Sequence, residues 1–354
     1  MSRGLAGPVS LMHMNIVPTS RLAAAAAIAV LLNAAPAIGP DLNNITGSSG
    51  LILIDKLGHH ILFFDPATHK ELSSLDADAN PHDVAISPDR KTAYVPIYGD
   101  GVYGRNPHPG HSIDIIDLAS RQKTGTIDIA PYQAPHDIKI SSAGTLYVVC
   151  DLSRKLLVID PKTREIKAAI DTEGTGHWFT VLPDGSKAYV ANKNDKPFVS
   201  VIDLKAGKMI ARVPAPNGTQ GISASPDGKR VLALDLKDPV VLMIDTATDT
   251  VVDKVPLEES ARGAYVIRYA PDGKNVLICA LNSTIYVLDA SDLHAKQHIV
   301  KAGKDPMGFA FAPDHRTVLI ANHGDGTVSV LDLKEQRITG NFSAGTGIES
   351  GTYY

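Results

Sequence analysis

Residues 183–192 read Pro-Asp-Gly-Ser-Lys-Ala-Tyr-Val-Ala-Asn, a tight turn followed by a short apolar run. Pro-Asp-Gly is typical of a turn, because Pro presets its own φ and Gly adopts conformations that other residues avoid. Tyr and Val in the run that follows favour a pleated strand. The stretch therefore predicts a turn that leads into a buried strand.

The same pattern recurs on both sides of this stretch. Pro226-Asp227-Gly228 and Pro271-Asp272-Gly273 are further copies of the turn, and each copy precedes an apolar run. A second apolar run in each unit ends in an acidic residue, at Asp65, Asp117, Asp160, Asp203, Asp245, Asp289 and Asp332. These positions are 52, 43, 43, 42, 44 and 43 residues apart. A period near 43 with several short strands in each unit is typical of a propeller blade.

The chain is therefore predicted to be all-β, a seven-bladed β-propeller of four-stranded blades that occupies residues 38–354 as one domain. The first blade, residues 50–76, lacks its innermost strand. Ser343–Gly347 aligns with Lys301–Asp305 of the preceding unit, so Gly347–Tyr354 is expected to supply that strand. The C-terminal strand would then join the N-terminal blade and leave no unpaired edge in the ring.

Residues 187–192, Lys-Ala-Tyr-Val-Ala-Asn, resemble the Tyr-Val-Thr-Asn strand of the YVTN-type β-propeller repeat family. Val318–Asn322 is a looser copy, and the resemblance extends over residues 45–354. It implies an exported bacterial seven-bladed propeller. It implies no single activity, because the family includes binding proteins, surface proteins and enzymes.

Residues 1–37 have the features of a secretory signal peptide. Arg21 precedes the apolar run Leu22–Leu32, and Ala35-Pro36-Ala37 is a small-residue cleavage site. The protein is therefore expected to be periplasmic or extracellular. An uncleaved membrane anchor is the alternative, although the run is shorter than the roughly 20 residues of a spanning helix. No second run of that length follows, so no transmembrane segment is expected once the signal is removed.

Charge and motifs exclude several classes of protein. Residues 1–37 contain two Arg and no acidic residue, so residues 38–354 carry 32 basic and 38 acidic residues, a net charge of −6. This balance argues against a nucleic-acid partner. The absence of a P-loop, a G-x-S-x-G elbow and a C-x-x-C-H motif argues against a nucleotide enzyme, a serine hydrolase and a c-type cytochrome. Cys150 and Cys279 are expected to be two buried thiols.

The first strand of each blade lines the channel of a propeller, so one position of the repeat was compared in all blades. Six residues before the turn proline, or its equivalent, stand His82, His136, His177, Gln220, Tyr265 and Met307. The C-terminal strand places Glu349 at this position, or Ile348 if the register slips by one. Three imidazoles and a carboxylate at one level predict a site for Cu, Fe, Ni or Zn. Duplication of a residue during repeat evolution is the alternative explanation.

Glu349 either completes the metal shell or acts as a base, and Tyr265 is a second catalytic candidate. Several further residues are expected near the metal. Asp83 and Asp137 follow two of the histidines and can orient an imidazole. Trp178 can wall a substrate pocket. The insertion Tyr98–His111 is predicted to be a lid, which adds His108 and His111 as candidates; His323 is expected on the same face.

Two functions are compatible with these residues. The first is a metal-dependent lyase, hydrolase or oxygenase that acts on a small molecule in the channel mouth. The alternative is a non-catalytic metal- or protein-binding propeller of the cell envelope, in which a partner protein takes the place of a substrate.

Overall fold

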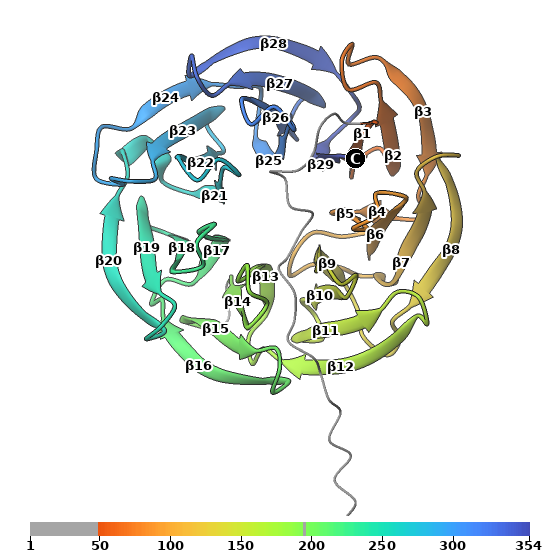
Figure 1. Ribbon diagram of the computed structural model, residues 1–354, viewed down its shortest axis with the longest axis horizontal. Coiled ribbons are helices and arrows are strands. Elements are labelled where there is room, and N and C mark those ends of the chain that lie inside the picture. The colour runs from red at the N-terminus through yellow and green to blue at the C-terminus, as the bar shows by residue number, and fades with distance from the viewer. Residues whose placement is uncertain (1–48, 194–195) are drawn as a thin grey trace, which may run out of the picture. The chain divides into compact units, whose positions relative to one another are not determined.

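The computed structural model describes residues 49–193 and 196–354. The expected signal peptide, residues 1–37, lies outside the described residues. Seven antiparallel sheets stand around a central axis as the blades of a ring (Figure 1). This arrangement confirms the predicted seven-bladed propeller.

The blades are numbered along the chain from the one that contains the first described strand. From the channel outward, blade 1 consists of β29 (Ile348–Tyr353), β1 (Leu51–Asp55), β2 (His60–Phe64) and β3 (Glu71–Asp76). Blade 2 consists of β4 (Asn80–Pro81) with β5 (Ala85–Ile86), then β6 (Thr92–Gly99), β7 (Pro109–Asp117) and β8 (Gln122–Asp128). Blade 3 consists of β9 (Pro135–Ile140), β10 (Leu146–Cys150), β11 (Lys155–Asp160) and β12 (Glu165–Asp171).

The remaining blades follow the same order. Blade 4 consists of β13 (Gly176–Val181), β14 (Lys187–Asn192), β15 (Phe198–Asp203) and β16 (Lys208–Pro214). Blade 5 consists of β17 (Thr219–Ala224), β18 (Arg230–Asp235), β19 (Val240–Asp245) and β20 (Thr250–Pro256). Blade 6 consists of β21 (Ala264–Tyr269), β22 (Asn275–Ala280), β23 (Thr284–Asp289) and β24 (His298–Lys301). Blade 7 consists of β25 (Pro306–Phe311), β26 (Thr317–Asn322), β27 (Thr327–Asp332) and β28 (Arg337–Ser343).

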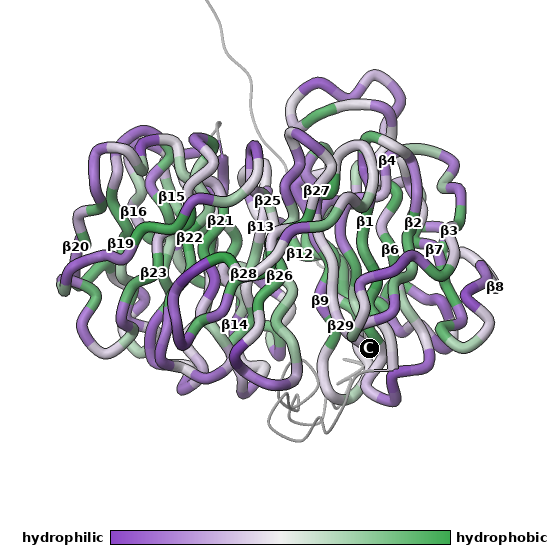
Figure 2. Tube along the Cα trace, turned by 90° about the horizontal axis from the view of Figure 1, so that it is seen from above, coloured by the Kyte–Doolittle hydropathy of each residue, from purple (hydrophilic) through white to green (hydrophobic). Residues whose placement is uncertain are grey.

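Burial follows the position of a strand in its blade. The second strands, such as β14 and β26, are buried along almost their whole length, because both faces pack against neighbouring blades. Outer strands such as β16 and β20 alternate between more and less exposed residues, as expected for a sheet edge that faces water on one side. Figure 2 shows the hydrophobic residues gathered in the inner strands of the blades.

The ring closes where the sequence predicts. β29 pairs antiparallel with β1, with Leu53 opposite Gly351 and Asp55 opposite Ile348. The buried Asp55 carboxylate accepts hydrogen bonds from the amides of Thr346, at 2.9 Å, and Gly347, at 2.7 Å. One side chain of the first blade therefore binds the start of the last strand.

Blade 2 differs from the predicted four continuous strands. Its innermost strand is divided, because the ladder to β6 stops after Pro81 and resumes at Ala85. Proline has no amide hydrogen to give to a ladder, and the amide of Val84 bonds the Asp83 carboxylate at 2.8 Å instead. The segment between the two pieces contains His82.

Three smaller features complete the fold. A 3₁₀ helix, Glu259–Ala261, precedes β21. Cys150 and Cys279 are buried and free, which confirms the prediction of two separate thiols. Within the described part of the chain, no helix has the length and apolar character needed to cross a membrane.

Candidate functional site

A backbone irregularity places one side chain of each blade at the same level of the channel. In six blades the ladder between the first and second strands shifts register at this residue, as at Glu349, which is skipped between the Asp55–Ile348 and Ile54–Ser350 pairs. In blade 2 the ladder stops at the same point. A β-bulge turns a side chain away from its regular direction and is common beside active sites. The seven residues, here called the inner ring, are Glu349, His82, His136, His177, Gln220, Tyr265 and Met307.

The three histidines of the inner ring lie in contact with one another. The ring centroids of His82 and His136 are 3.8 Å apart, and those of His136 and His177 are 4.1 Å apart. All three side chains are buried, and the Nδ1 atom of each has no hydrogen-bond partner. The edge of Trp178 packs on His177 with a centroid distance of 4.6 Å. Four aromatic rings from three consecutive blades thus form one buried row.

Glu349, on β29 of blade 1, contacts the end of this row at His82. Its Oε1 atom lies 3.6 Å from Nε2 of His82 and 3.6 Å from Nζ of Lys56. Its Oε2 atom lies 3.0 Å from Nδ1 of His323, without the alignment of a hydrogen bond. Ile348 packs instead into a hydrophobic cluster with Leu51 and Leu53. Of the two residues that the sequence left open, Glu349 is the one that contacts the histidines.

The surroundings hold the imidazoles in the neutral form. Burial, together with the charge of Lys56, lowers the pKa of His82 to about 3. Burial and the adjacent histidine lower the pKa of His136 and of His177 well below the usual value. Burial acts to raise the pKa of Glu349, but Lys56 and His323 together hold it well below its ordinary value. The site therefore combines neutral nitrogen donors with an ionised carboxylate, the forms that bind a metal ion.

A second ring of residues, five of them polar, lies next to the inner ring, and most of its members were not predicted from the sequence. In six blades the residue that follows the second strand's last pair with the inner strand is Lys56, Asp151, Lys193, Leu236, Leu281 or His323, in chain order. In blade 2 the corresponding residue is Tyr98, which stands four residues after Tyr94 as Lys193 stands four residues after Tyr189, and which lies between the paired residues Ile97 and Gly99. Only His323 was predicted. Counting one residue beyond the Tyr-Val-Ala-Asn strand in each repeat would have found the others.

Members of this second ring contact one another and the predicted lid, Tyr98–His111. The hydroxyl of Tyr98 donates to Oδ2 of Asp151 at 2.7 Å. Burial raises the pKa of Asp151 to about 6, against the lowering effect of this bond. Nζ of Lys193 lies 4.9 Å from the ring centroid of Tyr103 and 5.3 Å from that of Tyr265, and burial lowers the pKa of this lysine to about 8. Tyr265, a predicted catalytic residue, is thus placed beside a cation.

The insertion between β6 and β7 reaches inward over the channel (Figure 1). The Tyr103 ring lies 4.7 Å from His177, and its hydroxyl donates to the carbonyl of Thr175 at 2.7 Å. Gly99 permits the return of the loop, since its φ is 114° and a Cβ there would lie 2.3 Å from the carbonyl oxygen of His108. The loop therefore covers the histidines with a tyrosine.

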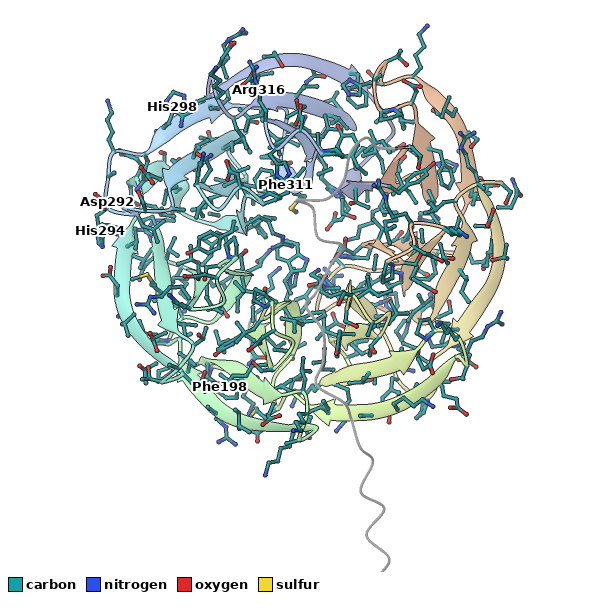
Figure 3. The ribbon with its side chains drawn as sticks, in the orientation of Figure 1. Phe198, Asp292, His294, His298, Phe311 and Arg316 are labelled. Atoms are coloured by element: carbon teal, nitrogen blue, oxygen red, sulfur yellow. The ribbon has the colours of Figure 1, made fainter. Side chains whose placement is uncertain are left out.

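His108 and His111, the histidines expected to help from this loop, lie away from the inner ring. The His108 side chain is 79% exposed and contacts Asp100, and the His111 side chain is 59% exposed and contacts Asp128 at 3.0 Å. His294 and His298 lie on the outer rim (Figure 3). Among the histidines that the structure describes, only those of the inner ring and His323 contact Glu349 or one another.

Asp83 and Asp137 contact a lysine rather than an imidazole. Nζ of Lys139 lies 3.5 Å from Asp83 and also bonds Asp137, whose second oxygen accepts the amide of Phe179 at 3.0 Å. Burial raises the pKa of Asp137 to about 6, although Lys139 opposes the shift. In this structure the two carboxylates therefore do not orient a histidine.

The donor types suit a metal, but the side chains are not yet arranged around one. Among the described residues, no group of three or more His, Cys, Asp or Glu side chains stands in a metal-binding arrangement. The imidazoles lie ring against ring, whereas a metal needs nitrogens about 2.0–2.1 Å from a common point. Side-chain rotation would be required. The unpartnered buried Nδ1 atoms are nevertheless the kind of group that an absent water, ion or ligand satisfies.

Comparisons with known proteins identify the fold and no more. The family model of a YNCE-like beta-propeller matches residues 167–272. A chain of hydrazine synthase from Kuenenia stuttgartiensis is similar in structure, with a TM-score of 0.64 and 20% identity over 76% of this chain and 88% of that chain. No curated protein matches the sequence. With 1781 matching chains of solved structures, the fold is too widespread to fix an activity.

Proposed function

Because the chain is a seven-bladed β-propeller of YVTN-type repeats, we propose that His82, His136, His177 and Glu349 bind a divalent transition metal at the mouth of its channel. The metal serves a reaction on a small molecule held beside it. Each of four blades would contribute one ligand, because the innermost strand of every blade faces the channel. The metal is Cu, Fe, Ni or Zn, all of which accept imidazole ligands.

The observation that supports this proposal is the unpartnered Nδ1 atom of each inner-ring histidine. Buried polar atoms are almost always hydrogen-bonded. Three unpartnered Nδ1 atoms on neighbouring imidazole rings therefore need a common explanation. The buried Glu349 carboxylate does not satisfy these atoms, because it lies 3.6 Å from Nε2 of His82 and not at an Nδ1 atom of the row. A cation with nitrogen ligands satisfies all three at once.

The chain's own residues define what else the site does. When bound, a metal of this kind polarises a substrate oxygen or activates water. Glu349 supplies negative charge, held in the ionised form by Lys56 and His323. Trp178 and Tyr103 cover the imidazole row on two sides and exclude bulk water. Lys193 and Tyr265, which lie beside each other, are the candidates to donate a proton to a substrate oxygen.

We place this activity outside the cytoplasm, in the periplasm or the extracellular medium, on the strength of the signal-like segment at residues 1–37. The net charge of −6 over residues 38–354 favours a small-molecule substrate over nucleic acid.

Elemental analysis of protein purified without an affinity tag tests the proposal. We expect close to one equivalent of one transition metal in the wild-type protein. His136→Ala should lose it, because His136 is the middle ring of the row. His111→Ala is the matched control, since His111 faces solvent and contacts Asp128 away from the inner ring. Wild-type protein that takes up no Cu, Fe, Ni or Zn, even after incubation with each, would overturn the proposal.

A further inference from the structure

A chamber adjoins the imidazole row inside the channel. Its volume is about 250 Å³, which is room for about eight waters and lies below the range of drug-sized sites. His82 and Glu349 contribute to its wall. Apolar side chains contribute most of the remainder, with Trp178, Met307 and Phe309 the largest. The chamber therefore suits a small, partly apolar molecule that reaches the histidines.

The three other charged groups of the chamber wall, Asp83, Lys139 and Glu349, already have ion-pair partners. Lys139 lies between Asp83 and Asp137 and contacts both carboxylates. Glu349 contacts Lys56. These groups need no charged ligand.

Arg268 is the exception. Its Nη1 atom donates to the carbonyls of Ile222, at 3.2 Å, and Ile267, at 2.9 Å. Its guanidinium lies 5.7 Å from the Trp178 ring centroid. Among the described residues, no carboxylate lies within 4.0 Å of it. The carboxylates of Asp83 and Asp137 interact with this guanidinium over a longer distance only. A half-buried guanidinium on the wall of a chamber, without a direct ion pair, is a recognition group for an anion.

The repeat makes this contrast clear. Lys139 stands three residues after His136, and Arg268 stands three residues after Tyr265, so both occupy one level of the channel. In blades 2 and 3 the residue after the inner-ring histidine is an aspartate, and these two neutralise Lys139. In blade 6 that place is taken by Val266. The same level thus carries one cation in direct ion pairs, Lys139, and one without a direct ion pair, Arg268.

We propose that the chamber binds a small planar monoanion, an aromatic or unsaturated carboxylate. Its carboxylate pairs with Arg268, and its flat body lies against Trp178 and Phe309. Guanidinium binds carboxylate through parallel hydrogen bonds, and an aromatic wall favours a planar ligand. The proposal deepens the proposed function, since it names the class of substrate for the same site. The anion contact itself needs no metal.

Benzoate is the probe, with benzyl alcohol as its uncharged counterpart. Trp178 is the only tryptophan of the chain, so its fluorescence reports on the chamber directly. In chelator-treated protein we expect benzoate to change the emission saturably and benzyl alcohol to bind at least about tenfold more weakly, because it lacks the charged partner. Measurement without metal separates this result from the metal test: either proposal can fail while the other stands.

Variants locate the anion contact. Arg268→Gln should weaken benzoate binding at least about tenfold, and Arg268→Lys should restore part of it. Arg212→Gln is the control, since Arg212 is exposed and pairs with Glu173. Equal binding of benzoate and benzyl alcohol to the wild type, or equal benzoate binding by the wild type and Arg268→Gln, would overturn the proposal. The wild-type comparison decides the matter even if the Arg268 variants fail to fold.

Discussion

Nε2 of His82 lies 3.6 Å from Oε1 of Glu349, although the two residues belong to the second blade and to the last strand of the chain. The contact exists because β29 pairs with β1 and thereby brings the C-terminus beside blade 2. Closure of the ring and assembly of the candidate site are therefore one event. A change that loosens β29 is expected to disturb both.

Glu349→Gln should destabilise the metal-free protein by about 3 kcal/mol at pH 7. The Glu349 and Lys56 side chains are only 7% and 10% exposed, so the variant leaves a buried cation without its partner. Urea unfolding measures the loss. Glu71→Gln, on an exposed outer strand, should stay within about 0.5 kcal/mol of the wild type. Equal stabilities of the wild type and Glu349→Gln would contradict the charge assignment.

Asp55→Asn should loosen the C-terminal strand selectively. The Asp55 carboxylate accepts the amides of Gly58, Thr346 and Gly347, and an amide side chain cannot accept all three. We expect about 2 kcal/mol of destabilisation and faster hydrogen exchange in residues 347–354. Asp160→Asn is the control, because Asp160 accepts amides within its own turn only. Unchanged exchange at the C-terminus in Asp55→Asn would show that β29 is held by its ladder alone.

The inner ring could be found from the sequence because the bulge recurs at one place in the repeat. Counting back from the turn proline gives Gln220 and Met307 as reliably as His136, although their side chains differ. Alignment of the closing strand left Glu349 and Ile348 as the two choices, and the register in the structure selects Glu349. Because the motif repeats, equivalent positions in different blades can be aligned, which a single copy of the motif would not allow.

Contacts that depend on side-chain direction were harder to predict. In the lid, histidine was the expected contact residue, but Tyr103 turns inward while His108 and His111 face solvent. Nothing in the order Tyr-Gly-Arg-Asn-Pro-His determines which side chain a loop directs toward the channel. By contrast, the pairing of Asp137 with Lys139 follows from the two-residue period of a strand and could have been predicted.

Tyr103→Ala should uncover the imidazole row. The Tyr103 ring covers His177 and is held by its bond to the Thr175 carbonyl, while His177 is only 5% exposed. Modification of His177 by diethylpyrocarbonate, followed by mass spectrometry, should become several-fold faster. Val102→Ala, on the exposed side of the same loop, should leave the rate unchanged. Equal rates in the wild type and Tyr103→Ala would show that the loop does not act as a lid.

Tyr98→Phe should destabilise the protein more at pH 8 than at pH 5. Asp151 has a pKa of about 6 in the folded state, above its unfolded value near 3.9, so the folded state binds the extra proton between these values. Its contribution to stability therefore falls as pH rises from about 4 to 6, and above pH 6 the folded protein carries a buried carboxylate. The Tyr98 hydroxyl compensates that charge at 2.7 Å.

Loss of the hydroxyl should thus cost about 1 kcal/mol at pH 5, where Asp151 is largely protonated, and about 2–3 kcal/mol at pH 8, where it is charged. Urea unfolding at the two pH values measures the difference. Tyr147→Phe is the control: burial alone raises the pKa of Tyr147, so its substitution should have the same effect at both values. If Tyr98→Phe were as costly at pH 5 as at pH 8, Asp151 would remain ionised across this range, and the second ring would carry one more negative charge beside the histidines.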